Sequence, residues 1–261
     1  YINAIKESID LGNKNIKAVF DPANGTGSII LERVLKEFNI DYKIINGISD
    51  GNFPVHHPDP SVEENMQMLK DEINNNHYEI GLGIDGDADR VGVVDDKGNF
   101  ITIDNLMIVI YKYLNPTLKN RHAIMDVKCS KAMLDEMNKI NLPCEVYRTG
   151  NSYMNLKINE EKLDFGGEFS GHLWFTDKWI GTDDGIYNAL RIIEMLSKIE
   201  VPLSSLLKDI PKYYHTPEIK IEVKEETKSL IIEKIKEYLD SQNIKYNHID
   251  GVRIDYEDGF T

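Results

Sequence analysis

Apolar residues occur along the chain as short continuous runs separated by stretches with a helical period. Residues 16–20 form one such run, and the polar turn 21–27 separates it from residues 28–38, whose apolar side chains fall on one helical face. A second apolar run follows at 42–45. This order predicts a strand, a helix and a returning strand, which together make a βαβ unit.

The same order of runs returns in the middle of the chain. Residues 122–125 and 144–147 are predicted strands, and residues 131–140 between them form a predicted helix. Asp21 and Asp126 end the first strand of their respective units. This correspondence indicates a duplicated α/β domain.

Further elements lie between and after these two units. The pattern predicts helices at 66–74, 105–114 and 186–199, and strands at 80–84, 91–94 and 100–103. Because strands alternate with helices, we expect an α/β fold of two similar domains, each with a mainly parallel mixed sheet covered by helices. We place the first domain at 1–104 and the second at 105–211.

The character of the sequence changes after Pro211. Residues 218–223 and 247–256 alternate as half-buried strands do, and residues 227–239 have the pattern of a charged amphipathic helix. We therefore expect residues 212–261 to form part of a third, α+β domain. A fragment of this kind buries little surface alone, so we expect the domain to be truncated here.

Composition narrows the class of partner. The formal net charge of −14 argues against nucleic acid, whose phosphate backbone needs a basic surface. An anionic sugar phosphate could still bind through local cations or a metal ion. No apolar run approaches the ~20 residues that cross a bilayer, and the two cysteines, Cys129 and Cys144, suit a reducing compartment. We expect a cytoplasmic protein with no membrane partner.

A run of alternating aspartates follows the predicted strand 80–84. Asp85, Asp87 and Asp89 are separated by small residues, and Arg90 comes directly after them. Hard divalent cations prefer several oxygen ligands, and small spacers let a loop curl around the ion. An EF-hand is excluded because Arg90 stands where that loop needs glycine. The stretch therefore predicts a divalent-metal site with a cation beside it for a phosphoryl group.

A second polar stretch, rich in glycine, lies at 166–172. Glu168, Ser170 and His172 offer a carboxylate, a hydroxyl and an imidazole, a mixture that suits sugar hydroxyls because these both donate and accept. A serine-hydrolase elbow would need glycine where Glu168 stands. The residues alone leave two interpretations open, a sugar-binding loop and an ordinary polar loop.

Together these stretches resemble the α-D-phosphohexomutases, and within that family the bacterial phosphomannomutase/phosphoglucomutase group. The resemblance rests on the loops 85–90 and 167–172 and extends to residues 50–60, 126–129, 183–187 and 250–253. The family interconverts hexose 1- and 6-phosphates through a hexose 1,6-bisphosphate, with a phosphoserine and Mg²⁺. The resemblance implies domains two and three of such an enzyme and the start of domain four, acting on glucose or mannose phosphates.

The resemblance also implies roles for individual residues. Arg90 and Lys128 would be catalytic residues beside the transferred phosphate. Asn151 stands where relatives usually carry histidine, and it would still bind a sugar hydroxyl. The implied Mg²⁺ ligands are Asp85, Asp87 and Asp89, and the implied substrate-binding residues are Glu168, Ser170, His172 and Asn151.

Other functions stay open beside the mutase. A metal-dependent sugar phosphatase and a non-catalytic sugar-phosphate-binding module fit the same residues, and phosphoglucosamine mutase is an alternative within the family. The serine loop of the family, Thr-x-Ser-His-Asn-Pro, does not occur in the sequence. We therefore expect these residues alone to be inactive. The pair His56 and His57 lacks a third residue at metal-ligand spacing, so we interpret it as part of a structural loop.

Overall fold

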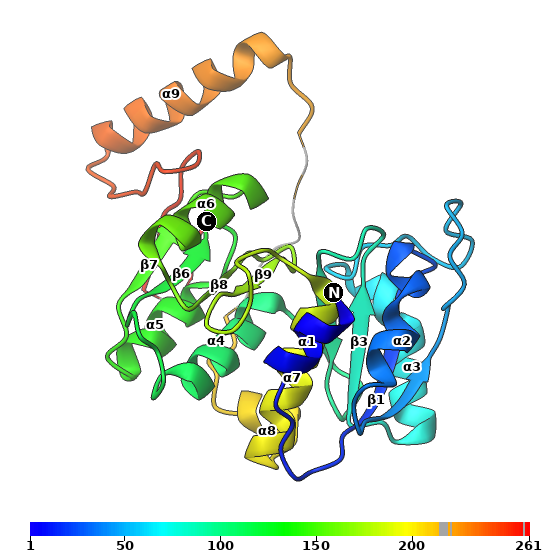
Figure 1. Cartoon of the computed structure of the whole chain (residues 1–261). Coiled ribbons are helices and arrows are strands. Elements are labelled where there is room, and N and C mark those ends of the chain that lie inside the picture. Colours follow the sequence, from blue (N-terminus) through cyan, green and yellow to red (C-terminus); the bar gives the residue numbers. More distant parts are fainter. Residues whose placement is uncertain (214–218, 220, 258) are drawn as a thin grey trace.

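The computed structural model describes residues 1–213, 219, 221–257 and 259–261 of the chain. Its first α/β unit contains a five-stranded sheet. The strand order is β2-β1-β3-β4-β5. Figure 1 labels the two neighbouring strands β1 and β3 of this sheet. Strand β1 is parallel to β2 and β3, whereas the β3–β4 and β4–β5 pairs are antiparallel. The bounds are β1 Lys17–Asp21, β2 Asp41–Ile44, β3 Ile80–Ile84, β4 Val91–Val94 and β5 Phe100–Ile101.

The second unit repeats this arrangement. Its four-stranded sheet has the order β7-β6-β8-β9, with β6 parallel to β7 and β8, and β8 antiparallel to β9. Asp21 and Asp126 both end the strand that is parallel to both of its neighbours. The predicted α/β class and the predicted duplication are therefore confirmed. The bounds are β6 Ala123–Asp126, β7 Cys144–Tyr147, β8 Phe165–Gly167 and β9 Leu173–Phe175.

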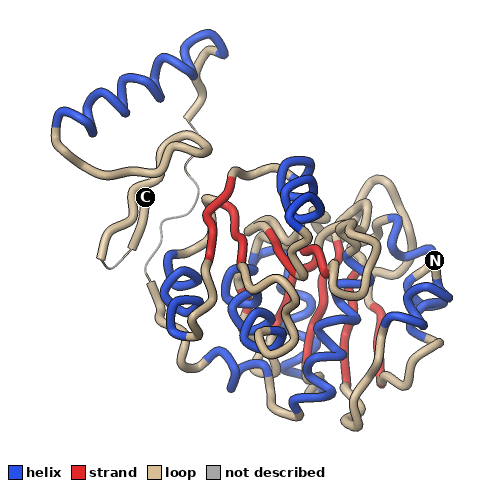
Figure 2. Tube along the Cα trace, turned by 60° about the vertical axis from the view of Figure 1, so that its left-hand side comes forward, coloured by secondary structure: helices blue, strands red, loops and turns tan. Residues whose placement is uncertain are grey.

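Helices cover both sheets (Figure 2). In the first unit these are α1 Ile2–Ser8, α2 Leu31–Leu35 and α3 Gln67–Asn76, with short 3₁₀ helices at Thr26–Ile29 and Glu63–Met66. In the second unit and after it they are α4 Ile103–Leu114, α5 Lys131–Lys139, α6 Asn151–Glu161, α7 Gly185–Ile199 and α8 Leu203–Leu207.

Helix α7 joins the two units. Its residues from Gly185 to Ser197 are all buried, and it contacts β3 and β4 of the first sheet and β9 of the second. A helix that is buried on every side belongs to the interior rather than to one surface. One continuous apolar core accordingly includes Phe20 of the first unit, Phe165 of the second and Ile186 of α7. This packing fixes the two sheets relative to each other.

Several predicted elements differ in the structure. The predicted helix 28–38 is a 3₁₀ turn, Thr26–Ile29, followed by the single short helix α2. The predicted strand 100–103 ends at Ile101, since Thr102 is already the N-cap of α4. The sequence patterns did not predict α1, α6, α8, β8 and β9.

The C-terminal region contains one long helix, α9 Glu225–Ser241, at the predicted place. The predicted strand 218–223 lies partly outside the described residues, and the rest of it forms no strand. Residues 247–256 form isolated bridges, Asn247 with Arg253 and Asp255 with Phe260, rather than the predicted strand. A strand needs a partner along its whole length, and the described chain provides only these bridges. No helix among the described residues is both long and apolar enough to cross a membrane.

Candidate functional site

The aspartate loop lies directly after β3, at the carboxyl end of the first sheet. Asp85 is fully buried, and its Oδ1 accepts hydrogen bonds from the backbone amides of Asp89 and Arg90, both at 3.0 Å. Ala88 has a φ of +68° at the turn. The loop therefore curls around its first carboxylate, as small spacers permit.

Arg90 is held between two carboxylates. Its Nε donates to Asp85 Oδ2 at 2.7 Å, and its Nη1 donates to Asp59 Oδ1 at 3.2 Å. Burial raises the pKa of Asp85 to about 6, although hydrogen bonds from Arg90 oppose the shift. Burial opposes ionisation of Asp59, but hydrogen bonds from Ser61 and the charge of Arg90 lower its pKa. The guanidinium is thus fixed in direction before any phosphate binds.

The donors in this loop fit a hard divalent cation. Asp85, Asp87 and Asp89 each offer an oxygen, and these oxygens lie within 4.8 Å of one another. Asp89 Oδ1 is buried and accepts no hydrogen bond from the described residues. Its nearest cation is Arg90 Nε at 3.8 Å. A buried oxygen without a hydrogen bond is costly, and an oxygen-preferring ion would satisfy it. The structure therefore contains an acidic group that could hold a metal.

The glycine-rich loop joins β8 to β9. The amide of Glu168 donates to the carbonyl of His172 at 2.9 Å, and Gly171 adopts a φ of +105° at the tip. Glu168 Oε2 lies 3.1 Å from His172 Nδ1, and Ser170 Oγ lies 2.9 Å from the same nitrogen. The three predicted sugar-binding side chains therefore form one hydrogen-bonded cluster.

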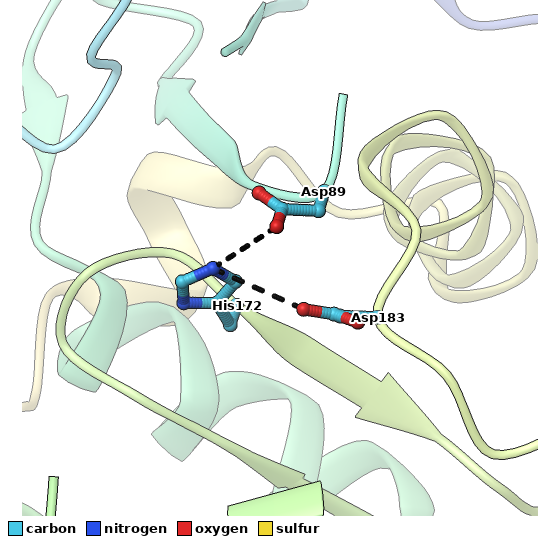
Figure 3. Close-up of side chains that lie close together, drawn as sticks. All are labelled: Asp89, His172 and Asp183. Atoms are coloured by element: carbon cyan, nitrogen blue, oxygen red, sulfur yellow. Dashed lines mark ion pairs between the residues drawn. The ribbon is translucent and has the colours of Figure 1, made fainter. Parts of the chain in front are cut away.

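The two loops meet, although they are far apart in the sequence. The amide of Val91 donates to the carbonyl of Gly171 at 3.1 Å, and Arg90 and His172 form an isolated antiparallel bridge. His172 Nε2 lies 3.4 Å from Asp89 Oδ2 and 3.9 Å from Asp183 Oδ2 (Figure 3). The aspartate loop and the glycine-rich loop are thus two parts of one site.

The N-terminus of α7 supports the aspartate loop from the other side. The amide of Gly185 donates to the carbonyl of Ala88 at 2.8 Å, and Asp184 caps the helix by accepting from the amide of Tyr187 at 2.9 Å. A Cβ atom on Gly185 would lie 2.6 Å from the carbonyl oxygen of Arg90. Only glycine allows this approach without displacing backbone.

His172 is the basic centre of the site. Burial alone would lower its pKa, but hydrogen bonds and charge interactions with Asp89 and Glu168 outweigh burial and raise the pKa to about 9. In the absence of metal, the imidazole is therefore expected to be protonated at neutral pH.

We expect the metal-free chain to lose about 2 kcal/mol of stability between about pH 7 and about pH 10 through His172 alone. A pKa raised from 6.5 to about 9 on folding gives stability that is fully present below pH 6.5 and is lost as the pH rises through 9. Urea unfolding with chelator present, for the original chain and for His172→Gln, would measure this. The difference between the two chains should shrink as the pH rises. A difference that is constant over this range would contradict the prediction.

Two predicted residues lie elsewhere around the site. Asn151 is the first residue of α6, and its side-chain Nδ2 donates to Asp183 Oδ2. It therefore holds the carboxylate that faces His172. Lys128 is exposed in the turn after β6. Asn151 is therefore linked to the cluster through Asp183, and Lys128 lies at the end of the second sheet.

The sequence analysis missed three acidic residues of this site. Asp59 lies in a proline-rich stretch that we interpreted as a structural loop, and it holds Arg90. Asp183 lies just before α7, and its carboxylate faces His172. Asp126 is fully buried and accepts from the amide of Phe169 at 3.2 Å. The position of Asp126 at the end of β6, which matches the position of Asp21 at the end of β1, was the sequence signal that could have identified it.

Models of two consecutive domains of one protein family match the chain. The model described as phosphoglucomutase/phosphomannomutase, alpha/beta/alpha domain II, matches residues 1–98. The model of alpha/beta/alpha domain III of the same family matches residues 102–214. Both matches follow the order of the two structural units.

Whole-chain relatives agree with these matches. A phosphomannomutase/phosphoglucomutase of Pseudomonas syringae pv. tomato is 34% identical over 260 residues, which are 100% of this chain and 56% of the relative. A phosphoglucomutase of Neisseria gonorrhoeae is 34% identical over 248 residues, which are 94% of this chain and 54% of the relative. The crystal structure of a phosphoglucomutase/phosphomannomutase family protein from Burkholderia thailandensis is 32% identical, with a TM-score of 0.88, and the match covers 100% of this chain and 55% of that one. This chain therefore spans little more than half the length of these relatives.

Proposed function

Since this chain belongs to the phosphoglucomutase/phosphomannomutase family of α-D-phosphohexomutases, we propose that it forms the metal-binding and sugar-binding parts of a Mg²⁺-dependent phosphohexomutase. Its substrates are glucose or mannose 1- and 6-phosphates, and its intermediate is a hexose 1,6-bisphosphate. The contact of 3.4 Å between Asp89 and His172 carries this proposal, because it joins the metal loop to the sugar loop.

The aspartate loop provides the phosphate side of the site. Asp85, Asp87 and Asp89 would hold Mg²⁺, which supplies positive charge for a phosphoryl group in transfer. Arg90 is already directed by Asp85 and Asp59, so it binds phosphate oxygens without first having to be ordered. Lys128 adds a second cation for the same phosphate.

The glycine-rich loop provides the sugar side. Glu168, Ser170 and His172 group acceptors and donors in one hydrogen-bonded cluster, so either orientation of a hexose phosphate can pair its hydroxyls there. Asn151 acts in this arrangement by holding Asp183, in addition to any hydroxyl that it binds. His172 contacts both loops and therefore aligns the sugar with the phosphate side.

We expect Glu168→Gln to weaken glucose 1-phosphate binding by roughly tenfold or more, because a hydrogen bond to a charged group contributes about 1.5–3 kcal/mol. Calorimetric titration of this chain, saturated with Mg²⁺, would measure the affinity. Glu161→Gln is the matched control, since Glu161 is an exposed residue at the far end of α6. Equal affinities for the original chain and Glu168→Gln would contradict the assignment of the sugar loop.

Turnover separates the mutase from the alternative functions. The chain is assayed by phosphorus NMR with glucose 1-phosphate and a trace of glucose 1,6-bisphosphate, alone and together with a polypeptide that supplies the Thr-x-Ser-His-Asn-Pro loop. Glucose 6-phosphate formed only with that polypeptide supports a mutase. Release of inorganic phosphate in the same assay run without glucose 1,6-bisphosphate indicates a sugar phosphatase. Binding of glucose 1-phosphate without any turnover indicates a binding module. Faster reaction with glucosamine 1-phosphate would favour phosphoglucosamine mutase.

A further inference from the structure

Arg253 is a buried cation outside the site described above. Only 3% of it is exposed, and its Nη1 donates to the carbonyl oxygens of Val127 and Cys129, both at 2.7 Å. Its Nε and Nη2 donate to Asp255 Oδ1 at 3.0 and 2.8 Å, and its guanidinium carbon lies 4.1 Å from the ring centre of Phe260. The C-terminal segment is therefore joined to the second unit by one guanidinium, two of whose hydrogen bonds go to the turn after β6.

The two carbonyls that Arg253 binds belong to the residues on either side of Lys128. Two further hydrogen bonds hold the same turn. The amide of Cys129 donates to the carbonyl of Asp126 at 3.2 Å, and the amide of Ser130 donates to Asp104 Oδ2 at 2.8 Å. Arg253 thus completes a set of bonds that fixes the backbone on both sides of Lys128. A lysine in its place would have a single ammonium on a flexible stem and could not match this fork.

The same C-terminal segment reaches a second loop of the site. Asp250 Oδ2 accepts from the amide of Thr149 at 2.9 Å, and Thr149 Oγ1 donates to Asp126 Oδ2 at 3.2 Å. The next amide, that of Gly150, donates to Glu168 Oε1 at 2.6 Å. Asp250 and Arg253 therefore contact the two turns that follow β7 and β6, and one of these turns supports the sugar loop directly.

We propose that Arg253 is a positioning residue, which fixes the turn 127–129 and thereby the backbone position from which the Lys128 side chain extends, and that residues 250–255 dock the C-terminal region onto the active-site loops. The role of Lys128 as a phosphate-binding residue rests on the function proposed above. The fixing of the turn rests only on the contacts of Arg253 and can be tested separately.

Amide hydrogen exchange in the full 261-residue chain tests the fixing of the turn. In Arg253→Ala, the amides of Cys129 and Ser130 should exchange roughly tenfold faster or more, because the turn loses two charge-assisted bonds. Arg253→Lys keeps the positive charge but loses the planar guanidinium, which donates to both carbonyls. Its exchange rates should therefore lie between those of the original chain and those of Arg253→Ala. The amides of β1 should not change, which shows that the fold is intact.

The matched control for this experiment is Arg121→Ala. Arg121 belongs to the same unit, is exposed and donates to a single carbonyl, that of Asn115. Its removal should leave the exchange of Cys129 and Ser130 unchanged. Unchanged exchange of these two amides in Arg253→Ala, with β1 intact, would overturn the proposal.

A double-mutant cycle tests the link to Lys128. If Arg253 acts through Lys128, then Arg253→Ala and Lys128→Ala each weaken glucose 1-phosphate binding, and the double variant binds no more weakly than Lys128→Ala alone. Independent, additive losses would overturn the positioning role. If the original chain does not bind the sugar phosphate, the function proposed above fails, and the exchange result still decides whether Arg253 fixes the turn.

Discussion

Replacing Asp87 with alanine is expected to lower the affinity for Mg²⁺ at least about a hundredfold while leaving the free energy of unfolding nearly unchanged. Asp87 is exposed at the tip of the aspartate loop, so its carboxylate is available to an ion rather than engaged in shaping the loop. Calorimetric titration with Mg²⁺, or with Mn²⁺ for a stronger signal, would measure the affinity. Urea unfolding of the metal-free chain would measure the stability.

The comparison with Asp85→Ala separates a ligand from a residue that shapes the loop. Removing Asp85 should also abolish metal binding, and it should cost about 4 kcal/mol of unfolding free energy. This cost arises because the Arg90 side chain and two loop amides lose their acceptor. An exposed aspartate elsewhere, Asp209, gives the control Asp209→Ala, which should change neither quantity. Tight Mg²⁺ binding by Asp87→Ala would contradict the assignment of the metal loop.

The second large effect is expected for Gly185→Ala, which should cost about 3 kcal/mol of unfolding free energy and weaken Mg²⁺ binding roughly tenfold. The added Cβ would lie 2.6 Å from the carbonyl oxygen of Arg90 and 3.1 Å from that of Ala88, so backbone must move. Because those carbonyls belong to the aspartate loop, we expect the substitution to displace the proposed metal ligands, although Gly185 itself would not bind the metal.

The control for Gly185→Ala is Gly51→Ala. No atom lies within 4 Å of a Cβ atom built on Gly51, and its φ is not in the left-handed region. This variant should keep both the stability and the metal affinity of the original chain. Equal metal affinity for Gly185→Ala and Gly51→Ala would show that contact with α7 does not shape the aspartate loop.

The Gly185 contact also explains why the two α/β units form one site. Helix α7 begins in the second unit, yet its first amide donates to a carbonyl of the first unit, at Ala88. The glycine-rich loop makes the matching contact from the other side, through the carbonyl of Gly171. The aspartate loop is therefore held on two sides by the second unit. Substitutions in either unit are expected to alter the conformation of this loop.

Local sequence patterns determined most of the regular structure. Alternating apolar runs and helical periods correctly predicted the strands β1 to β4, β6 and β7, because these patterns depend on near neighbours in the sequence. The short strands β8 and β9 were missed, since each has only three residues and two of those in β8 are glycines. Their formation depends on pairing with β6 and with each other, which no local pattern records.

The site residues, like the strands, were predicted from the sequence only in part. The spacing of Asp85, Asp87 and Asp89 and the composition of residues 166–172 were sufficient to predict a metal loop and a candidate sugar loop. Their residue types and spacing are local, and the donors that a cation or a sugar requires follow from residue type.

Only the tertiary structure decided how these parts act together. It placed His172 against Asp89, Asp59 against Arg90, and Arg253 against the turn that carries Lys128. Each of these contacts joins residues far apart in the sequence, and none of them follows from a local period. They arise because two sheets pack around one buried helix, and that packing depends on the whole apolar core rather than on any single segment.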